Sequence, residues 1–217
     1  MKYVICRGGW PGALKGRTDH ARLAIAKDLF NQTCDLSKQT YYDYISGFEK
    51  LMIIEDIEAW CPAIRSKTSI RSSKKRNFVD HSIGAAALGL SPEYFSSDYK
   101  TLGFLFESLC IRDLKIYTSA NGGMISYYHD RYNLEADAVL HLEDGRYALI
   151  EFKLGQTEVE EEARHLCKIE RLIIEHNENE KQNPLRLPDL KLIITGTKYG
   201  YLRPDGVYVI PIGCLKD

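Results

Sequence analysis

The chain has 217 residues, of which 44% are hydrophobic, and its 29 lysines and arginines nearly balance its 30 aspartates and glutamates. This composition is typical of one sizeable globular domain or two small ones, and the near-zero net charge by itself favours neither nucleic acid nor a membrane as partner. Because no apolar stretch approaches the ~20 residues of a membrane-spanning helix and no signal peptide is recognisable, we expect a cytoplasmic protein without a membrane partner.

The first part of the chain predicts helices followed by a strand. Apolar residues recur at helical spacing over residues 19–31, and a second helix begins after Ser37, which suits its N-cap. The run MIIEDIEAW, residues 52–60, is β-like. Helix, turn, helix and strand in this order are typical of a winged helix, and we predict a winged-helix-like domain over residues 1–91.

A basic segment follows this predicted strand. Residues 59–79 contain no acid and carry six basic residues, which are Arg65, Lys67, Arg71, Lys74, Lys75 and Arg76. The local positive field favours contact with the DNA backbone and identifies the segment as a basic wing. The alternative is a solvated loop with an ordinary abundance of lysine and arginine, and the sequence leaves both interpretations open.

The second part of the chain predicts a mixed α/β domain over residues 92–217. A short helix capped by Asp80 or Ser82 precedes Pro92, and this break places the domain boundary near Ser91. Periodicity then predicts a helix over 99–117, strands over 124–129, 135–142 and 146–154, a helix over 159–175, and two strands within 190–196 and 207–213. The fold class is therefore α/β, with elements in the order αβββαββ around a central mixed sheet.

Two acids lie on neighbouring strands of this predicted sheet. The tripeptide EDG at residues 143–145 suits a three-residue hairpin loop with a left-handed glycine, which pairs Leu142 with Arg146. Counting back along both strands sets Asp137 opposite Glu151. Ionised carboxylates ~5 Å apart repel each other unless a cation or a proton relieves them. A Mg²⁺ ion held by Asp137 and Glu151 would explain the arrangement.

A lysine and a third acid extend this candidate site. Lys153 lies on the same strand face, opposite Glu135, where it would stabilise the attacking hydroxide or the charge of a phosphoryl-transfer transition state. Glu107 has mostly apolar helical neighbours, so we expect it to face the protein and support the site. In the structural alternative, Lys153 pairs with Glu135 or Glu151 at a strand end, and Glu107 pairs with a surface basic residue. The spacing of these residues alone does not decide between the catalytic and the structural interpretation.

The order of these residues resembles the PD-(D/E)xK nuclease superfamily. Glu107 lies on a predicted helix, Asp137 on a strand, and the tripeptide EFK, with Glu151 and Lys153, on the next strand. The resemblance covers residues 99–197 and implies a restriction-endonuclease-like αβββαβ core, in which the strand acids bind Mg²⁺, the lysine assists hydrolysis of DNA and the helical glutamate completes the site. The proline of the superfamily's name is absent from EADAV.

A second resemblance extends over nearly the whole chain. It is carried by GGWPGAL, SKQTYYDYISGFEKLMIIEDIEAW, KKRNFVD, LGFLFESL and EADAVLHLEDGRYALIEFKLG. These segments look like the C-terminal region of many prokaryotic AAA-type ATPases, which implies a winged helix, a nuclease-like domain and an ATPase partner or a missing ATPase half. The chain lacks GxxxxGK[ST], so we expect no ATP site here. We predict a Mg²⁺-dependent DNA nuclease. The alternatives are a catalytically inactive nucleic-acid-binding or regulatory module, and a protein-interaction tail of an ATPase.

Other chemistry has less support. The chain has no GxSxG motif, so a serine nucleophile is not expected. The triple acid at residues 160–162 suits a solvated helix face, where negative charge favours a helix N-terminus. His165 could approach the site from the same helix, but a surface or core-edge position is the usual place for a lone histidine.

Overall fold

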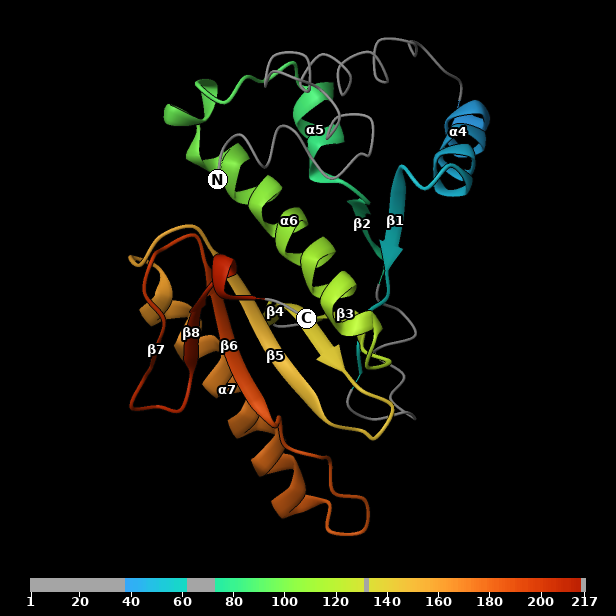
Figure 1. The fold of residues 1–217 in the computed structure, drawn as a ribbon. Coiled ribbons are helices and arrows are strands. Elements are labelled where there is room, and N and C mark those ends of the chain that lie inside the picture. The colour runs from blue at the N-terminus through green and yellow to red at the C-terminus, as the bar shows by residue number, and fades with distance from the viewer. Residues whose placement is uncertain (1–37, 62–72, 131–132, 216–217) are drawn as a thin grey trace. The chain divides into compact units, whose positions relative to one another are not determined.

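The computed structural model describes residues 38–61, 73–130 and 133–215 (Figure 1). The chain divides into two compact units, the first comprising Met1–Asp56 and Arg76–Arg112 and the second Ile57–Lys75 and Asp113–Asp217. The predicted domains, residues 1–91 and 92–217, divide the chain elsewhere and stay a prediction.

The first unit contains short elements of the predicted types. The helix predicted after Ser37 is α4 (Lys38–Lys50), and the predicted β-like run contains β1 (Ile54–Ile57), which forms a two-stranded sheet with β2 (Lys75–Phe78). The predicted cap is confirmed, since the Asp80 carboxylate accepts a 2.9 Å hydrogen bond from Ser82 N–H and starts α5 (His81–Ala87). Because the helix predicted over 19–31 and the Ser37 cap lie outside the described residues, the winged helix stays a prediction.

The remaining elements follow the predicted αβββαβ order. They are the 3-10 turn η2 (Tyr94–Ser96), α6 (Tyr99–Ser119), β3 (Met124–His129), β4 (Glu135–His141), β5 (Tyr147–Lys153), α7 (Val159–Asn179), β6 (Leu190–Thr195), β7 (Tyr201–Leu202), β8 (Tyr208–Pro211) and the 3-10 turn η3 (Ile212–Cys214). The predicted α/β fold class is confirmed. The two-residue strand β7 was not predicted from the sequence. Within the described ranges, no helix has the length and apolar character needed to cross a membrane.

The second unit is built on a six-stranded mixed sheet in the order β3-β4-β5-β6-β8-β7. The strands β3, β4 and β5 are antiparallel neighbours, whereas β6 runs parallel to both β5 and β8. The long connection from β5 to β6 carries α7, as a parallel pair of strands requires. As a result, the end of the β4–β5 hairpin distant from its turn lies beside the start of α7.

The register of the β4–β5 hairpin agrees with the prediction. Leu142 N–H donates to the Arg146 carbonyl over 2.9 Å, and Gly145 has a φ of +84°, the left-handed conformation that the loop requires. The paired Cα positions run from His141 with Tyr147 to Ala138 with Ile150. One step further along both strands brings Asp137 level with Glu151.

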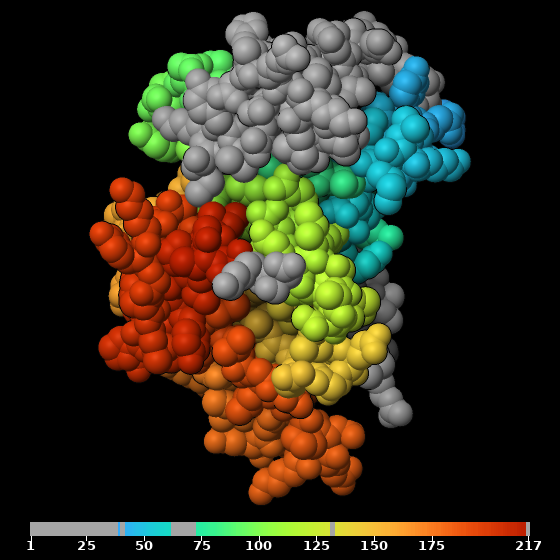
Figure 2. Space-filling model, in the orientation of Figure 1, coloured from blue at the N-terminus to red at the C-terminus, as the bar shows by residue number. Residues whose placement is uncertain are grey.

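One face of the sheet forms a core with α7. Inward residues of α7 recur every three or four positions and pack with apolar side chains of β4, β5, β6 and β8. Trp60 covers the edge of this core, with its ring centroid 4.7 Å from that of Tyr147. In Figure 2 the residues near the C-terminal end of this unit, coloured red, form one continuous area of the surface. The core places Glu151 of β5 in a water-poor environment, with 1% of its surface exposed.

Candidate functional site

Two carboxyl groups meet where β4 and β5 lie side by side. Glu151 is only 1% exposed, and its Oε1 atom has no hydrogen-bond partner. Asp137 is half-buried, and its Oδ2 atom accepts a 3.0 Å hydrogen bond from Phe152 N–H. The backbone of β5 thus fixes Asp137 beside Glu151, while one Glu151 oxygen remains without a partner. We call these two residues the acidic pair.

The acidic pair favours a proton over two negative charges. Burial raises the pKa of Glu151 well above its ordinary value, and the charge of Asp137, a hydrogen bond with it and the charge of Glu162 raise it further. Lys153 acts in the opposite direction but does not compensate. A buried carboxyl beside a second carboxyl takes up a proton more readily than a free one unless a cation relieves the repulsion.

Lys153 is a fixed positive charge beside the acidic pair. Its Nζ atom lies 2.8 Å from Oε1 of Glu162. Burial opposes its charge, but the hydrogen bond to Glu162 and the charges of Asp137, Glu162 and Glu151 outweigh burial and raise the pKa of Lys153. An ammonium with a raised pKa keeps its proton at neutral pH, so Lys153 is suited to electrostatic stabilisation and not to general-base catalysis.

The sequence predicted a solvated helix face for the triple acid at residues 160–162, and this prediction is wrong for Glu162. Glu162 is buried on α7, whereas the neighbouring Glu160 is exposed and pairs with Arg203 at 2.9 Å. The residues of α7 that face the core are Val159, Glu162, Ala163, Leu166, Ile169 and Ile173, and their spacing is the signal that could have identified Glu162. The structural alternative paired Lys153 with Glu135 or Glu151, but the ion pair of Lys153 is with Glu162.

His165 completes this arrangement. Its Nδ1 atom lies 3.0 Å from Oε2 of Glu162, one helical turn away, and its side chain is 41% exposed. The sequence predicted a surface or core-edge position for His165, and it did not predict the contact with Glu162. The structure therefore links Lys153, Glu162 and His165 in a chain that runs from the acidic pair to the helix surface.

Glu107 lies in the middle of α6 and is half-buried. It belongs to the first unit, whereas the acidic pair belongs to the second. Its predicted support of the site stays a prediction.

The basic segment is described only in part, because Arg65, Lys67 and Arg71 lie outside the described residues. Lys74 forms a 2.7 Å ion pair with Glu58, and Lys75 lies in β2. Arg76 forms ion pairs of 3.1 Å with Asp56 and 3.7 Å with Glu49. Acids that precede the segment in the sequence therefore offset part of its charge, which weakens the local field expected to attract DNA.

The acidic pair has the donor chemistry of a Mg²⁺ site. Both groups offer carboxylate oxygens, and Oε1 of Glu151 has no protein hydrogen bond to lose. The residues that the structure describes contain no group of three or more histidine, cysteine, aspartate or glutamate side chains arranged to hold a metal ion. A Mg²⁺ ion is commonly held by one or two carboxylates, with water and phosphate completing its ligands. Asp137 and Glu151 fit this minimal pattern.

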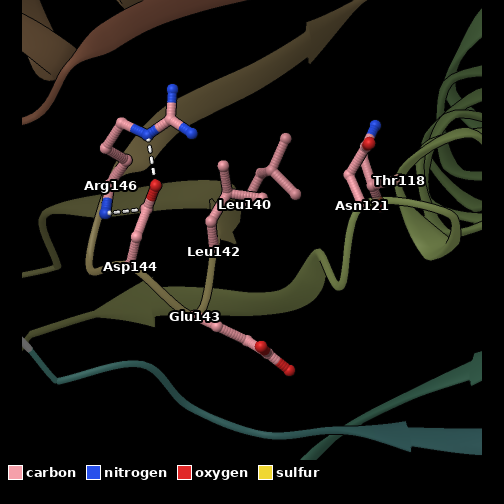
Figure 3. Close-up of a pocket in the computed structure, with 7 residues that line it drawn as sticks. All are labelled: Thr118, Asn121, Leu140, Leu142, Glu143, Asp144 and Arg146. Atoms are coloured by element: carbon pink, nitrogen blue, oxygen red, sulfur yellow. Dashed lines mark hydrogen bonds and ion pairs between the residues drawn. The ribbon is translucent and has the colours of Figure 1, made fainter.

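A separate pocket of about 560 Å³ lies at the turn end of the same hairpin (Figure 3). Leu140 and Leu142 lie between Thr118 and Asn121 on one side and the bonded pair of Asp144 and Arg146 on the other; Glu143 also lines the pocket. Arg146 donates to Asp144 over 2.7 Å, so its charge is locally balanced. The pocket contains none of the predicted site residues.

Comparison with known families gives two matches. The profile of the domain of unknown function DUF4143 matches residues 102–215, slightly more than half of the chain, and that of the domain of unknown function DUF8612 matches residues 26–94. The first match contains the whole acidic pair, Lys153 and Glu162. DUF4143 domains are commonly found C-terminal to AAA ATPases. No curated protein and no solved structure matches the chain.

Proposed function

This chain belongs to the DUF4143 family, and we propose that its mixed sheet carries a Mg²⁺-assisted DNA phosphodiesterase site of the PD-(D/E)xK type. Asp137 and Glu151 are the proposed metal ligands, and Lys153 is the proposed catalytic cation. The proposal includes association with an AAA-type ATPase, either as a partner protein or as a domain of the same polypeptide.

One observation carries the proposal. The buried carboxyl of Glu151 has an unpartnered oxygen and lies beside a second carboxyl, although an unsatisfied buried polar group costs about 1–3 kcal/mol. Residues with this combination of burial, raised pKa and a specific charged neighbour occur preferentially at functional sites. The αβββαβ order of the surrounding elements supports the same interpretation.

In DNA hydrolysis at this site, the bound ion and the side chains would have different roles. Mg²⁺ would neutralise the carboxylate charges and polarise the scissile phosphate. Asp137, fixed by Phe152 N–H, and Glu151, fixed by its strand, would hold that ion. The ammonium of Lys153 would stabilise negative charge that develops on the phosphate oxygens, and burial would strengthen this effect.

The test is cleavage of linear, supercoiled and branched DNA by the purified protein with Mg²⁺, compared with Asp137→Asn and Glu151→Gln. Both substitutions preserve shape and remove a metal-binding oxygen. We expect each to lower the cleavage rate by about 100-fold or more. Glu161→Gln, an exposed neutralisation on α7, is the matched control and should cleave like the wild type. Equal cleavage by Asp137→Asn and the control would refute the assignment.

A second candidate is a non-catalytic module that binds nucleic acid or an ATPase. It is favoured by the near-complete burial of Glu151 and by the engagement of Lys153 with Glu162. This candidate predicts no Mg²⁺-dependent difference between the wild type and Glu151→Gln in calorimetric titration. If it binds DNA, that binding should weaken with salt and with neutralisation of Lys74 and Arg76.

A further inference from the structure

Glu162 differs from the other acids in the first turn of α7. Its side chain is 12% exposed, whereas that of Glu160 is 67% exposed, and Glu161 is also exposed. Each Glu162 oxygen has its own partner, with Oε1 at 2.8 Å from Lys153 Nζ and Oε2 at 3.0 Å from His165 Nδ1. These two contacts, one to each oxygen, fix the orientation of the carboxylate.

The position of Glu162 brings a further negative charge close to the acidic pair. Its charge raises the pKa of Glu151, so it adds a third carboxyl to a region that already holds the acidic pair. A buried carboxylate in such a position is costly unless its partners give a specific benefit. One such benefit is that the ion pair with Glu162 holds the Lys153 ammonium, whose charge also interacts with Asp137 and Glu151.

We infer that Glu162 is a positioning residue for Lys153 and that His165 holds Glu162 in place. This inference rests on the proposed phosphodiesterase function. A lysine ammonium has three N–H donors. The donor that faces Glu162 anchors the flexible lysine side chain, and the ammonium would thereby be oriented toward a phosphate bound through an ion that Asp137 and Glu151 would hold. A lysine without this anchor would lose rotameric order and would stabilise the transition state less well.

His165 is a second position at which the anchoring of Lys153 can be tested. Its side chain is 41% exposed, so it tolerates substitution better than the buried Glu162. Removing its contact with Oε2 frees one end of the carboxylate but leaves the contact between Glu162 and Lys153. We therefore expect His165 substitutions to have the same kind of effect as Glu162 substitutions, with a smaller size.

The first experiment is steady-state DNA cleavage by Glu162→Gln, His165→Gln and the control Glu161→Gln. Glu162→Gln should lower kcat by about 10- to 100-fold, with little change in KM for DNA or in the Mg²⁺ dissociation constant, because only alignment is lost. His165→Gln should lower kcat by a smaller factor, about threefold. A kcat for Glu162→Gln equal to that of the control would overturn the inference while the proposed function stands. An inactive wild type would overturn both.

The second experiment observes Lys153 directly and covers the case in which Glu162→Gln folds poorly. In ¹⁵N-labelled protein, an ammonium held by a buried carboxylate gives a slowly exchanging N–H signal, which Lys153→Arg assigns by its disappearance. The signal should be present in the wild type and in Glu161→Gln, weaker in His165→Gln and absent in Glu162→Gln. An unchanged signal in both His165→Gln and Glu162→Gln would overturn the inference.

Discussion

Replacing Glu151 with glutamine is expected to stabilise the folded protein, although it removes a proposed metal ligand. Glutamine has nearly the same shape and carries no charge, and its amide can donate a hydrogen bond to Asp137. The substitution therefore removes the repulsion in the acidic pair without creating a cavity. A glutamate that served only to stabilise the fold would give the opposite result.

The size and the pH dependence of this gain follow from the burial of Glu151. Because burial and Asp137 raise the pKa of Glu151, the folded protein retains a proton that the unfolded chain has already lost. The free energy of unfolding of the wild type therefore falls as the pH rises from the ordinary glutamate pKa through the raised one. At pH values above the raised pKa the gain from Glu151→Gln should reach about 1–3 kcal/mol, the order of the desolvation penalty of a buried group without a partner, because the wild type then carries a buried charge that glutamine lacks.

The assay is urea unfolding without metal at a series of pH values. Trp60 reports on the second unit through its contact with Tyr147, and a Trp10→Phe background removes the other tryptophan. The wild type and Glu151→Gln should converge at acidic pH, where Glu151 is protonated in both states, and separate as the pH rises. Mg²⁺ at about 100 times its dissociation constant should raise the wild-type free energy of unfolding by about 2.7 kcal/mol and leave that of Glu151→Gln nearly unchanged.

Two results would refute this reasoning. Destabilisation by Glu151→Gln at neutral pH would mean that the carboxylate contributes favourable contacts to the fold. A gain independent of pH would mean that the charge of Glu151 is not the cause. Glu161→Gln serves as the control, and its unfolding should follow that of the wild type at each pH.

Two further predictions test the local geometry of the fold, one in each unit. Gly145→Ala should lower the free energy of unfolding by about 1 kcal/mol, because the residue has a φ of +84° although nothing lies within 4 Å of the added methyl group. Gly84→Ala should cost about 1–3 kcal/mol by overpacking, because its methyl group would lie 3.0 Å from Leu105 Cδ2 and 3.1 Å from Phe78 Cε2. Urea midpoints measure both, and a neutral result for either would contradict the corresponding local geometry.

Much of the hairpin that carries the acidic pair could be predicted because its constraints are local. Alternating side chains define two strands, and a glycine in the left-handed conformation at position 145 determines the loop length and hence the register. Once the register is known, the proximity of Asp137 and Glu151 follows by counting. The N-cap of α5 at Asp80 could be predicted for the same reason, since it depends on residues adjacent in the sequence.

Glu162 could not be predicted in this way because its role depends on tertiary packing. Three successive glutamates at a helix start are all favourable for the helix dipole, so composition does not separate them. The helical spacing of the apolar residues of α7 places Glu162 on their face, but its contacts with Lys153 and His165 are known only from the packed structure. The two-residue strand β7 was missed for a related reason, since its pairing with β8 follows from the position of β8 in the sheet and not from a pattern of its own.

The charge balance around Lys153 connects these observations. Asp137, Glu151 and Glu162 place three carboxyls near one ammonium, and the other group able to carry positive charge in this chain of contacts is the half-exposed His165. One ammonium cannot neutralise three carboxylates, so a proton on the acidic pair or an added cation must supply the difference. Stability alone would favour apolar side chains at these positions, since buried charged groups rarely improve on well-packed hydrophobic ones. Under the proposed function, a bound divalent cation would neutralise this excess negative charge, and the raised pKa of Glu151 would be the energetic consequence of holding these carboxyls together without the ion.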